Sequence, residues 1–382
     1  MDLHDGAVYV DSPIPAAVRQ VSPFFEQGIF CAQRTPLLLR KRVGTGFGLF
    51  ACKEINGVPV RMIDGDEAKK MPVRKGGAIF YSFNSQGNMH TVANRGYRHV
   101  LVLHGESNKR ASARPAARLY DYICVAGDIA AERYIDAGIF HPKEFECHRL
   151  IKTGDTFVQG LGSYHVAPET GDAILYAPTW EGFGGALNDY SSISTGGLAM
   201  AETAMRLTGR STLVIRPHPY LGMLRPRHLR DLIRGALDLG KRHHVRFDLG
   251  DANAAVRALV WAAIRTGRPG IGMANGKESI ALCLCDVSAM ESCCLKGGLP
   301  HMVLSRNFTP PDALASHYAV KAASNPDEIS SRLPAYLADP AALDSPFRAR
   351  MFTVSHPDFL SPDGAVRLNR LMIMIGKNSY WG

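Results

Sequence analysis

The chain has 382 residues, which is too long for one ordinary hydrophobic core and suits two domains of roughly 150 to 200 residues. Hydrophobic residues make up 46% and charged residues 21%, a composition that excludes an intrinsically disordered protein. With 44 Lys and Arg against 35 Asp and Glu, the formal net charge is +9, which favours anionic partners such as phosphates, nucleotides, anionic lipid or nucleic acid.

No targeting or membrane-spanning segment is expected. The start, MDLHDGAVYV, lacks the basic residues and apolar run of a signal peptide, and no stretch reaches 18 apolar residues. The eight cysteines show no paired C-x-x-C spacing, so we expect reduced core residues rather than a zinc site. The sequence therefore predicts a cytoplasmic protein, and it gives no sign of an obligatory metal or other cofactor.

Short apolar runs in the first half predict three strands of one sheet, at 76–82, 99–105 and 120–127. A helix is expected to follow the third strand, with Asp128 as its N-cap. From 141 to 170 the chain is rich in Gly, Pro, Thr and His and lacks periodicity, which predicts a linker.

A second series of strands and helices is expected after this linker. Its apolar runs predict four strands, of which the last should close the sheet: 173–180, 211–219, 279–286 and 301–305. Helical patterns alternate with them, near 196–208, near 226–240, near 252–265 and from Ser288 onward.

This alternation predicts an α/β protein with two Rossmann-like domains. We expect an N-terminal domain at 1–165, a C-terminal domain at 166–360 and a tail at 361–382 that docks back on the fold. Open parallel sheets bind ligands at their strand ends, so a cleft is expected between the domains. The tail carries apolar residues at helical spacing beside Arg367 and Arg370, and its alternative role is contact with an anionic membrane.

The stretch VLVLHGESNKR at 100–110 ends an apolar strand in a polar cluster. A neutral His104 can accept a proton, Gly105 lets a ligand approach the backbone, and Lys109 can pair with a phosphate. A surface loop after a core strand is the alternative interpretation.

Two further clusters follow expected strands. In YAPTWEGFGG, Thr179 and Trp180 precede glycines whose N–H groups suit an anion, and the indole offers a flat face to a base or sugar, unless it is a core residue. In VIRPHPY, prolines fix the loop around His218, and Arg216 would project to the same side. An arginine and a histidine together suit a diphosphate.

The fourth cluster, CLCDVSAMESCCLKGGLP, predicts a strand that ends at Asp286 and a helix capped by Ser288, with Glu291 as the capping-box partner. Capping explains both polar residues. The same helix N-terminus, including the N–H group of Ala289, also offers donors to a phosphate.

Taken in order, HGESNK, YAPTWEG, RPHP and CDVSAMESCCLKGGLP resemble the motifs of the CDP-glycerol glycerophosphotransferase family, which includes teichoic acid polymerases and capsule-polymer transferases. The resemblance covers residues 75 to 305. It implies the GT-B fold, with two Rossmann-like domains facing across a cleft. It also implies transfer of glycerol- or ribitol-phosphate from a CDP-alditol to a hydroxyl of a cell-surface polymer or its lipid-linked precursor, with release of CMP, by a cytoplasmic protein peripheral to the cell membrane.

The resemblance assigns roles to the residues of the four clusters. His104 becomes the general base on the acceptor side, Glu106 orients it or the acceptor, and His218 helps to hold the diphosphate. The candidate substrate-binding residues, from the resemblance and from the clusters themselves, are Gly105, Lys109, Thr179, Trp180, Arg216, Asp286, Ser288, Ala289 and Glu291.

Departures from the family pattern leave the donor open. Glu106 and Ser107 stand where a hydroxyl residue and a proline are common, and Ala289 stands where a second serine is common. Glu291 resembles the ribose-binding carboxylate of GT-B glycosyltransferases that use nucleotide-sugar donors, which are the alternative. A sugar-nucleotide epimerase is a further alternative, because such enzymes have the same two-domain architecture. A nucleic-acid-binding module is not expected, because Lys and Arg do not cluster with aromatic residues.

Overall fold

The computed structural model describes residues 4–11, 20–41, 54–55, 57–103, 105–109, 112–146, 149–182, 189–250, 252–305 and 309–377. The chain divides into two compact units. The first comprises Met1–Glu106, Ala113–Gln159 and Arg350–Gly382, and the second comprises Ser107–Ser112 and Gly160–Ala349. The chain thus enters the second unit after Gln159, whereas the expected boundary was 165, and it returns to the first unit at Arg350, whereas the tail was expected to begin at 361. In addition, the six residues 107–112 belong to the second unit.

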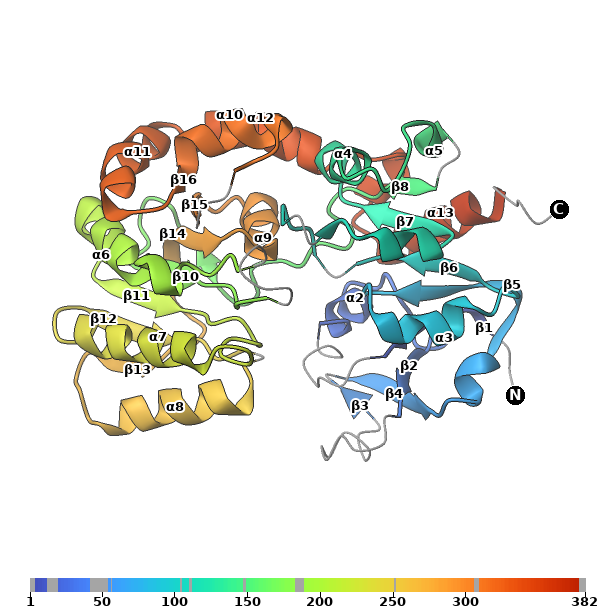
Figure 1. Cartoon of the computed structure of the whole chain (residues 1–382), viewed down its shortest axis with the longest axis horizontal. Coiled ribbons are helices and arrows are strands. Elements are labelled where there is room, and N and C mark those ends of the chain that lie inside the picture. Colours follow the sequence, from blue (N-terminus) through green and yellow to red (C-terminus); the bar gives the residue numbers. More distant parts are fainter. Residues whose placement is uncertain are drawn as a thin grey trace. The chain divides into compact units, whose positions relative to one another are not determined.

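The first unit contains an eight-stranded sheet in the order β3-β4-β2-β1-β5-β6-β7-β8 (Figure 1). Its neighbouring strands pair in parallel, except that β3 and β4 pair antiparallel. The strands are β1 (His4–Val10), β2 (Leu37–Arg40), β3 (Glu54–Ile55), β4 (Val58–Ile63), β5 (Val73–Tyr81), β6 (Arg98–Leu101), β7 (Tyr122–Val125) and β8 (Leu150–Lys152). The three predicted strands are confirmed as β5, β6 and β7, and the first 70 residues supply four more.

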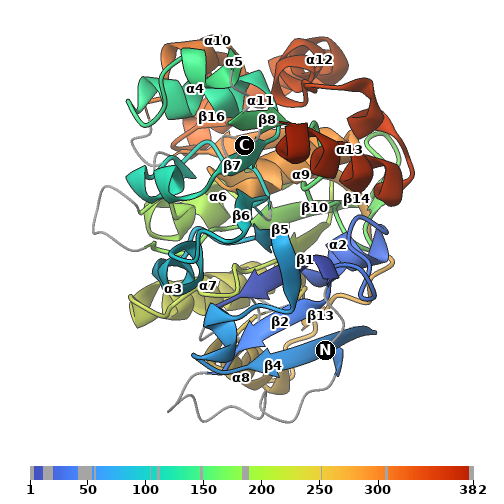
Figure 2. The same ribbon diagram turned by 90° about the vertical axis from the view of Figure 1, so that its right-hand side faces the viewer.

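Helices cover both faces of this sheet (Figure 2). They include α2 (Ser22–Glu26), α3 (Met89–Val92), α4 (Asp128–Asp136), α5 (Lys143–Glu146) and α13 (Gly364–Lys377). Val8 lies in an apolar cluster with residues of α2 and α13, whereas its neighbour Tyr9 lies in a cluster with residues of α3 and α4. Successive strand residues point to opposite faces, so a sheet covered on both sides needs apolar residues at consecutive positions.

The C-terminal helix α13 packs on the first unit. Leu368, Leu371 and Ile375 are buried in its core, and Arg370 forms an ion pair with Asp358 at 2.7 Å. The apolar stripe that could have faced a membrane is therefore used in packing. No helix within the described ranges has the length and apolar character to cross a bilayer.

The second unit contains a parallel sheet in the order β13-β12-β11-β10-β14-β15-β16, with β9 paired to β14. Its strands are β9 (His165–Val166), β10 (Ala173–Ala177), β11 (Thr212–Ile215), β12 (His244–Phe247), β13 (Ile271–Met273), β14 (Ser279–Asp286), β15 (His301–Leu304) and β16 (Ala322–Ala323). The chain runs outward from β10 to β13 and then returns to β14. The expectation that 301–305 is the last strand is wrong, because the two-alanine strand β16 pairs with β15.

Two apolar clusters also lie on the faces of this second sheet. One contains residues of α6 (Gly197–Thr208), α7 (Pro226–Leu239), α8 (Ala254–Arg265) and α11 (Pro326–Ala338), and the other contains residues of α9 (Ala289–Gly297). The remaining helices are α10 (Asp312–Lys321) and α12 (Pro340–Met351). Buried free cysteines fill much of the α9 side: Cys283, Cys285, Cys293 and Cys294. In the described part of the chain, no three His, Cys, Asp or Glu residues are grouped to hold a metal.

The N-cap of α4 differs from the prediction, and the residues at this helix start contact the segment with which the chain returns to the first unit. Gly127, rather than Asp128, is the N-cap, and the Asp128 N–H donates to Thr353 Oγ1 at 2.9 Å. Residues 150–152 of the expected linker form β8, and Thr153 pairs with Val354 in a β-bridge. These contacts hold the segment after Arg350 on the first unit.

We expect Gly127→Ala to destabilise the protein by about 1 to 3 kcal/mol, because a Cβ there would lie 2.5 Å from the Met351 carbonyl oxygen. Gly160→Ala is the matched control, since a Cβ at that position meets nothing within 4 Å, and it should change stability by less than about 0.5 kcal/mol. Denaturant unfolding followed by circular dichroism measures both. Equal stabilities for the two variants would contradict the proposed contact.

Candidate functional site

The candidate site lies in the second unit, at the carboxyl ends of β10 and β14. The strand order reverses between these two neighbours, so the loops that follow them diverge. In open parallel sheets, ligands bind at such a reversal point. Thr179 follows β10, Asp286 ends β14, and Lys109 reaches them from the 107–112 segment.

Asp286 is fully buried and ties two points of the connection between β10 and α6 to the end of β14. Its Oδ2 atom accepts hydrogen bonds from the N–H groups of Thr179 at 2.7 Å and Ser192 at 3.2 Å. Its Oδ1 atom has no hydrogen-bond partner within the described ranges. Burial raises the pKa of this carboxyl to about 7, against the opposing effect of its hydrogen bonds and of Lys109. Asp286 can therefore hold a proton near neutral pH.

Lys109 places a cation beside Asp286. Its Nζ atom donates to Thr179 Oγ1 at 2.9 Å and lies 5.5 Å from the centre of the Tyr190 ring. Desolvation lowers the pKa of Lys109 to about 8, although the carboxylates of Asp286 and Asp189 favour its charged form. At pH 7 the ammonium group is mostly charged, so an anion at this sheet edge would meet a cation and a hydroxyl.

Helix α9 begins immediately after this strand end. Ser288 is its N-cap, and the Ser288 hydroxyl accepts the Met290 N–H at 3.3 Å, as predicted. The N–H groups of the first helical turn, which starts at Ala289, have no intrahelical acceptor and carry the positive end of the helix dipole. The predicted capping box is only half formed, because the carboxylate of Glu291 turns to other partners.

Glu291 is almost completely enclosed by protein groups. Its Oε2 atom accepts hydrogen bonds from Asn108 Nδ2 at 2.9 Å and from the Tyr318 hydroxyl, and His317 Nε2 lies 3.4 Å from Oε1. Burial alone would raise its pKa, but His317 and the nearby cation of Lys321 bring the pKa down to about 2. Its Oε1 atom is buried and has no hydrogen-bond partner among the described residues.

Trp180 and His218 stack with their ring centres 5.8 Å apart and their planes 12° apart, and Tyr220 meets both rings edge-on. His218 Nδ1 accepts the N–H of Tyr220 at 3.1 Å, so the neutral imidazole carries its proton on Nε2. Trp180 is half-buried rather than a core residue. These rings form an aromatic group after β10 and β11.

Arg216 takes partners different from those of His218. Its Nε atom lies 3.7 Å from Asp248 Oδ2, and its guanidinium lies over the Tyr164 ring at 5.8 Å. The Tyr164 hydroxyl donates to the same Asp248 carboxylate. The strand β11 ends at Ile215, so the strand geometry that would align Arg216 with His218 does not continue. Arg216 and His218 therefore share no partner residue in these contacts, in contrast to the expected pair.

Glu181 was missed by the sequence reasoning. Its buried carboxylate accepts the N–H groups of Gly222, Leu224 and Arg225 at 3.1, 2.8 and 2.6 Å. The side chain of Arg225 also donates to Asp189 at 2.6 Å. Glu181 therefore fixes the loop after β11 against the loop after β10. The acid directly after Trp180 in YAPTWEG is the signal that could have pointed to it.

A cavity of about 290 Å³ opens at the ends of β15 and β16. Alanines of α10 and β16 line it, together with Ser305, Arg332 and the ring of Tyr318. Tyr318 is the residue whose hydroxyl reaches Glu291. This volume is close to the lower limit of ordinary ligand pockets.

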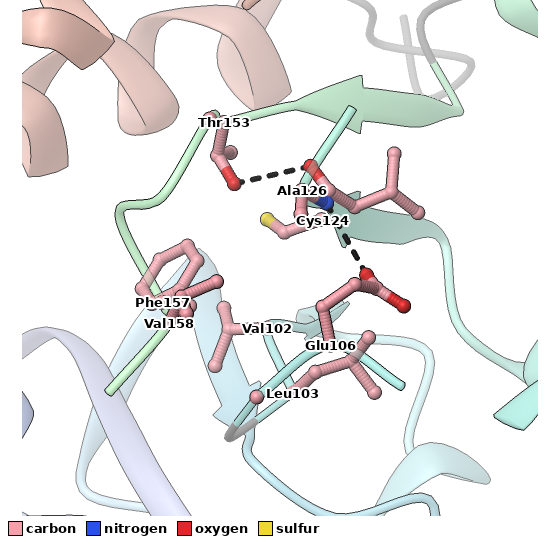
Figure 3. Close-up of a pocket in the computed structure, with 11 residues that line it drawn as sticks. Val102, Leu103, Glu106, Cys124, Ala126, Thr153, Phe157 and Val158 are labelled. Atoms are coloured by element: carbon pink, nitrogen blue, oxygen red, sulfur yellow. Dashed lines mark hydrogen bonds between the residues drawn. The ribbon is translucent and has the colours of Figure 1, made fainter. Parts of the chain in front are cut away.

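The first unit holds the remaining predicted residues. His104 lies outside the described residues. Leu103 before it has φ 61°, a left-handed conformation that leucine rarely adopts and that functional sites often store as strain. Gly105 and Glu106 line a cavity of about 10 Å³, with room for about one water (Figure 3).

Glu106 already has partners in this first unit. Its carboxylate forms an ion pair with Arg133. It also accepts the Ala126 N–H at 3.4 Å (Figure 3). These contacts connect the chain after β6 to the start of α4. A role for Glu106 in orienting His104 stays a prediction.

No protein-family model matches the sequence, and no curated protein matches it. Among solved structures, the UDP-glucose:anthocyanidin 3-O-glucosyltransferase in complex with UDP superposes with a TM-score of 0.52 at 8% identity, covering 99% of this chain and 100% of that one. The chain has the GT-B fold. The trehalose-phosphate synthase of Burkholderia vietnamiensis gives 0.49 at 11% identity, covering 99% of each chain, and a Thermobaculum terrenum O-GlcNAc transferase mutant gives 0.44 at 13%, covering 98% of this chain and 68% of that one.

The match to the glucosyltransferase, at a TM-score of 0.52, supports the fold expected from the resemblance, with two Rossmann-like units. The matches do not support the CDP-glycerol glycerophosphotransferase family in particular, since no match belongs to it among the structures compared above. At 8% identity, the likeness says nothing about which donor this chain uses.

We expect Asp286→Asn to remove a pH dependence of stability. The folded pKa of about 7 lies above the unfolded value near 3.9, so the native state keeps its proton longer and loses stability as pH rises between these values. The loss is at most about 1.4 kcal/mol per pH unit. Asparagine mimics the neutral acid and can still accept both N–H groups. Denaturant unfolding from pH 4 to 8 tests this, and parallel stability curves for wild type and variant would refute the raised pKa.

Proposed function

We propose that the protein is a glycosyltransferase that uses a nucleotide-sugar donor. The observation that carries this proposal is the contact of Lys109 Nζ with Thr179 Oγ1, 2.9 Å long, at the reversal point of the sheet and beside the N-terminus of α9. A cation, a hydroxyl and the positive end of a helix dipole are features that suit a diphosphate. The GT-B fold is consistent with this assignment.

The reaction proposed for this site is a displacement at the anomeric carbon. The acceptor hydroxyl forms a bond to that carbon, the bond from carbon to the donor diphosphate breaks, and the electron pair leaves with the nucleoside diphosphate. Lys109, Thr179 and the first turn of α9 would stabilise the charge that develops on the leaving phosphate. His104 remains the proposed general base that takes the hydroxyl proton.

The aromatic group gives the donor a second point of contact. Trp180 is half-buried and offers a flat face to a base or sugar ring, and His218 carries its donor hydrogen on Nε2. The carboxylate of Glu181 holds the loop that carries Leu224 and Arg225 close to this group. In this proposal Glu181 is a positioning residue.

The second candidate is transfer of glycerol- or ribitol-phosphate from a CDP-alditol to a polymer or lipid-linked acceptor. It is supported by the order of the four sequence motifs, and it needs the same diphosphate clamp. The acceptor hydroxyl would then attack the phosphorus distal to cytidine, and CMP would leave. Peripheral contact with an anionic membrane belongs to this candidate and stays a prediction.

The leaving group separates the two candidates. The full-length protein is incubated with UDP-, GDP- and CDP-sugars, CDP-glycerol and CDP-ribitol, and the nucleotides released are separated by chromatography. Release of a nucleoside diphosphate from a nucleotide-sugar supports the glycosyltransferase proposal. Release of CMP from a CDP-alditol alone overturns it in favour of the second candidate.

We expect Lys109→Met to lower kcat/KM for the donor by about 10² to 10³, because the leaving phosphate loses its cation. With a pKa of about 8, Lys109 loses its charge as pH rises, so the wild-type kcat/KM should fall above about pH 8. Arginine stays charged, so Lys109→Arg should lose that alkaline limb whatever activity it keeps. Initial rates from pH 6 to 10 measure this.

Lys241→Met is the matched control, because Lys241 is exposed and pairs with Asp238 on the surface. It should keep the wild-type rate and the wild-type pH profile. A Lys109→Met variant that folds and retains full kcat/KM would remove Lys109 from the diphosphate clamp.

A further inference from the structure

We propose that Asn108 and Glu291 form an anchor that positions Lys109 for donor binding. Glu291 is thus a positioning residue that acts through Asn108, rather than a ligand of the donor. The kinetic consequence rests on the proposed function, whereas the anchor itself concerns only the placement of segment 107–112.

The need for an anchor follows from the path of the chain. Segment 107–112 belongs to the second unit, while the residues directly before and after it belong to the first unit. Its described residues 107–109 lie in no strand or helix. Its position on the second unit therefore depends on side-chain contacts, of which those of Asn108 are buried.

Asn108 is locked between two partners. Its side chain is 2% exposed, and Nδ2 donates to Glu291 Oε2 at 2.9 Å and to the Tyr318 hydroxyl at 3.0 Å. The Tyr318 hydroxyl in turn donates to Glu291 Oε2. The three side chains therefore close a triangle of hydrogen bonds. This geometry fixes the orientation of the Asn108 side chain and the backbone that carries it.

The charge of Glu291 makes this anchor strong. His317 and Tyr318 from α10 face the carboxylate, and the cation of Lys321, also on α10, lowers the pKa of Glu291 further. With a pKa of about 2, Glu291 is an anion at any pH at which the protein works. Hydrogen bonds to an ionised acceptor are about twice as strong as neutral ones, and a buried carboxylate that loses a donor is costly.

The anchor acts on the next residue along the chain. Lys109 Nζ faces Thr179 and Tyr190 from the loops after β10, and it senses the carboxylates of Asp286 and Asp189. This half-buried position keeps its pKa near 8. If segment 107–112 detaches, Lys109 becomes solvated and its pKa should return toward the ordinary value of about 10.4.

The test measures the ionisation of Lys109 directly, without an activity assay. Wild type and Asn108→Ala are labelled briefly with acetic anhydride from pH 6 to 11, and modification of Lys109 and of exposed Lys241 is measured by peptide mass spectrometry. We expect a midpoint near pH 8 for Lys109 in wild type and an increase of about 2 pH units in Asn108→Ala. Lys241 serves as the internal reference in each sample.

Tyr336→Phe is the matched control. It also removes a buried hydroxyl from a carboxylate of the second unit, since Tyr336 donates to Asp344 at 2.7 Å, but it leaves the Asn108 triangle intact. Its Lys109 midpoint should stay near pH 8. Glu291→Gln keeps an acceptor for Asn108 without the charge, so its midpoint should lie between those of wild type and Asn108→Ala. Circular dichroism confirms that each variant is folded.

The outcomes separate the anchor from the proposed function. If folded Asn108→Ala keeps its Lys109 midpoint near pH 8, or if Tyr336→Phe shifts it equally, the anchor is overturned. If the midpoint rises in Asn108→Ala and kcat/KM for the donor falls at least about tenfold, both stand. If the midpoint rises and the rate does not change, the anchor stands and the role of Lys109 in the proposed reaction is refuted.

Discussion

The burial of one carboxylate, that of Asp286, is the constraint on which the candidate site depends. A buried acid must find hydrogen-bond donors or take up a proton, and Asp286 finds two N–H groups, of Thr179 and Ser192. These donors come from loops after β10, so the end of β14 fixes the loops of its neighbouring strand. The hydroxyl of Thr179 then has a defined position, and Lys109 binds to it.

The pKa values of Asp286 and Glu291, which are five residues apart, shift in opposite directions because their surroundings differ. Asp286 meets neutral N–H groups through one oxygen, and burial raises its pKa to about 7. Glu291 lies near His317 and Lys321 and accepts donors from Asn108 and Tyr318, so its pKa is about 2. One acid can therefore hold a proton near neutrality while the other gives a permanent charge.

The sequence predicted the elements better than it predicted the contacts. Buried parallel strands are apolar at consecutive positions, so runs such as 279–286 stood out, whereas the two alanines of β16 carry no pattern. Strand order decides where the reversal point lies, and that order depends on pairings far apart in the chain. The helix cap of Ser288 is a local contact and was predictable. The contact of Glu291 with Asn108 was not, because the two residues are 183 positions apart in the chain and meet only in the folded protein.

The position of the clamp along the diphosphate decides which chemistry it can serve. In sugar transfer the bond to carbon breaks, and charge develops on the phosphate distal to the nucleoside. In alditol-phosphate transfer the bridge between the phosphates breaks, and charge develops on the proximal phosphate. A cation stabilises a transition state only where charge grows. Lys109 is a single ammonium group held at a fixed point by Thr179 and by segment 107–112, so it is suited to one of these phosphates. In the proposed reaction, the segment 107–112 that places Lys109 would therefore also select which bond the site helps to break.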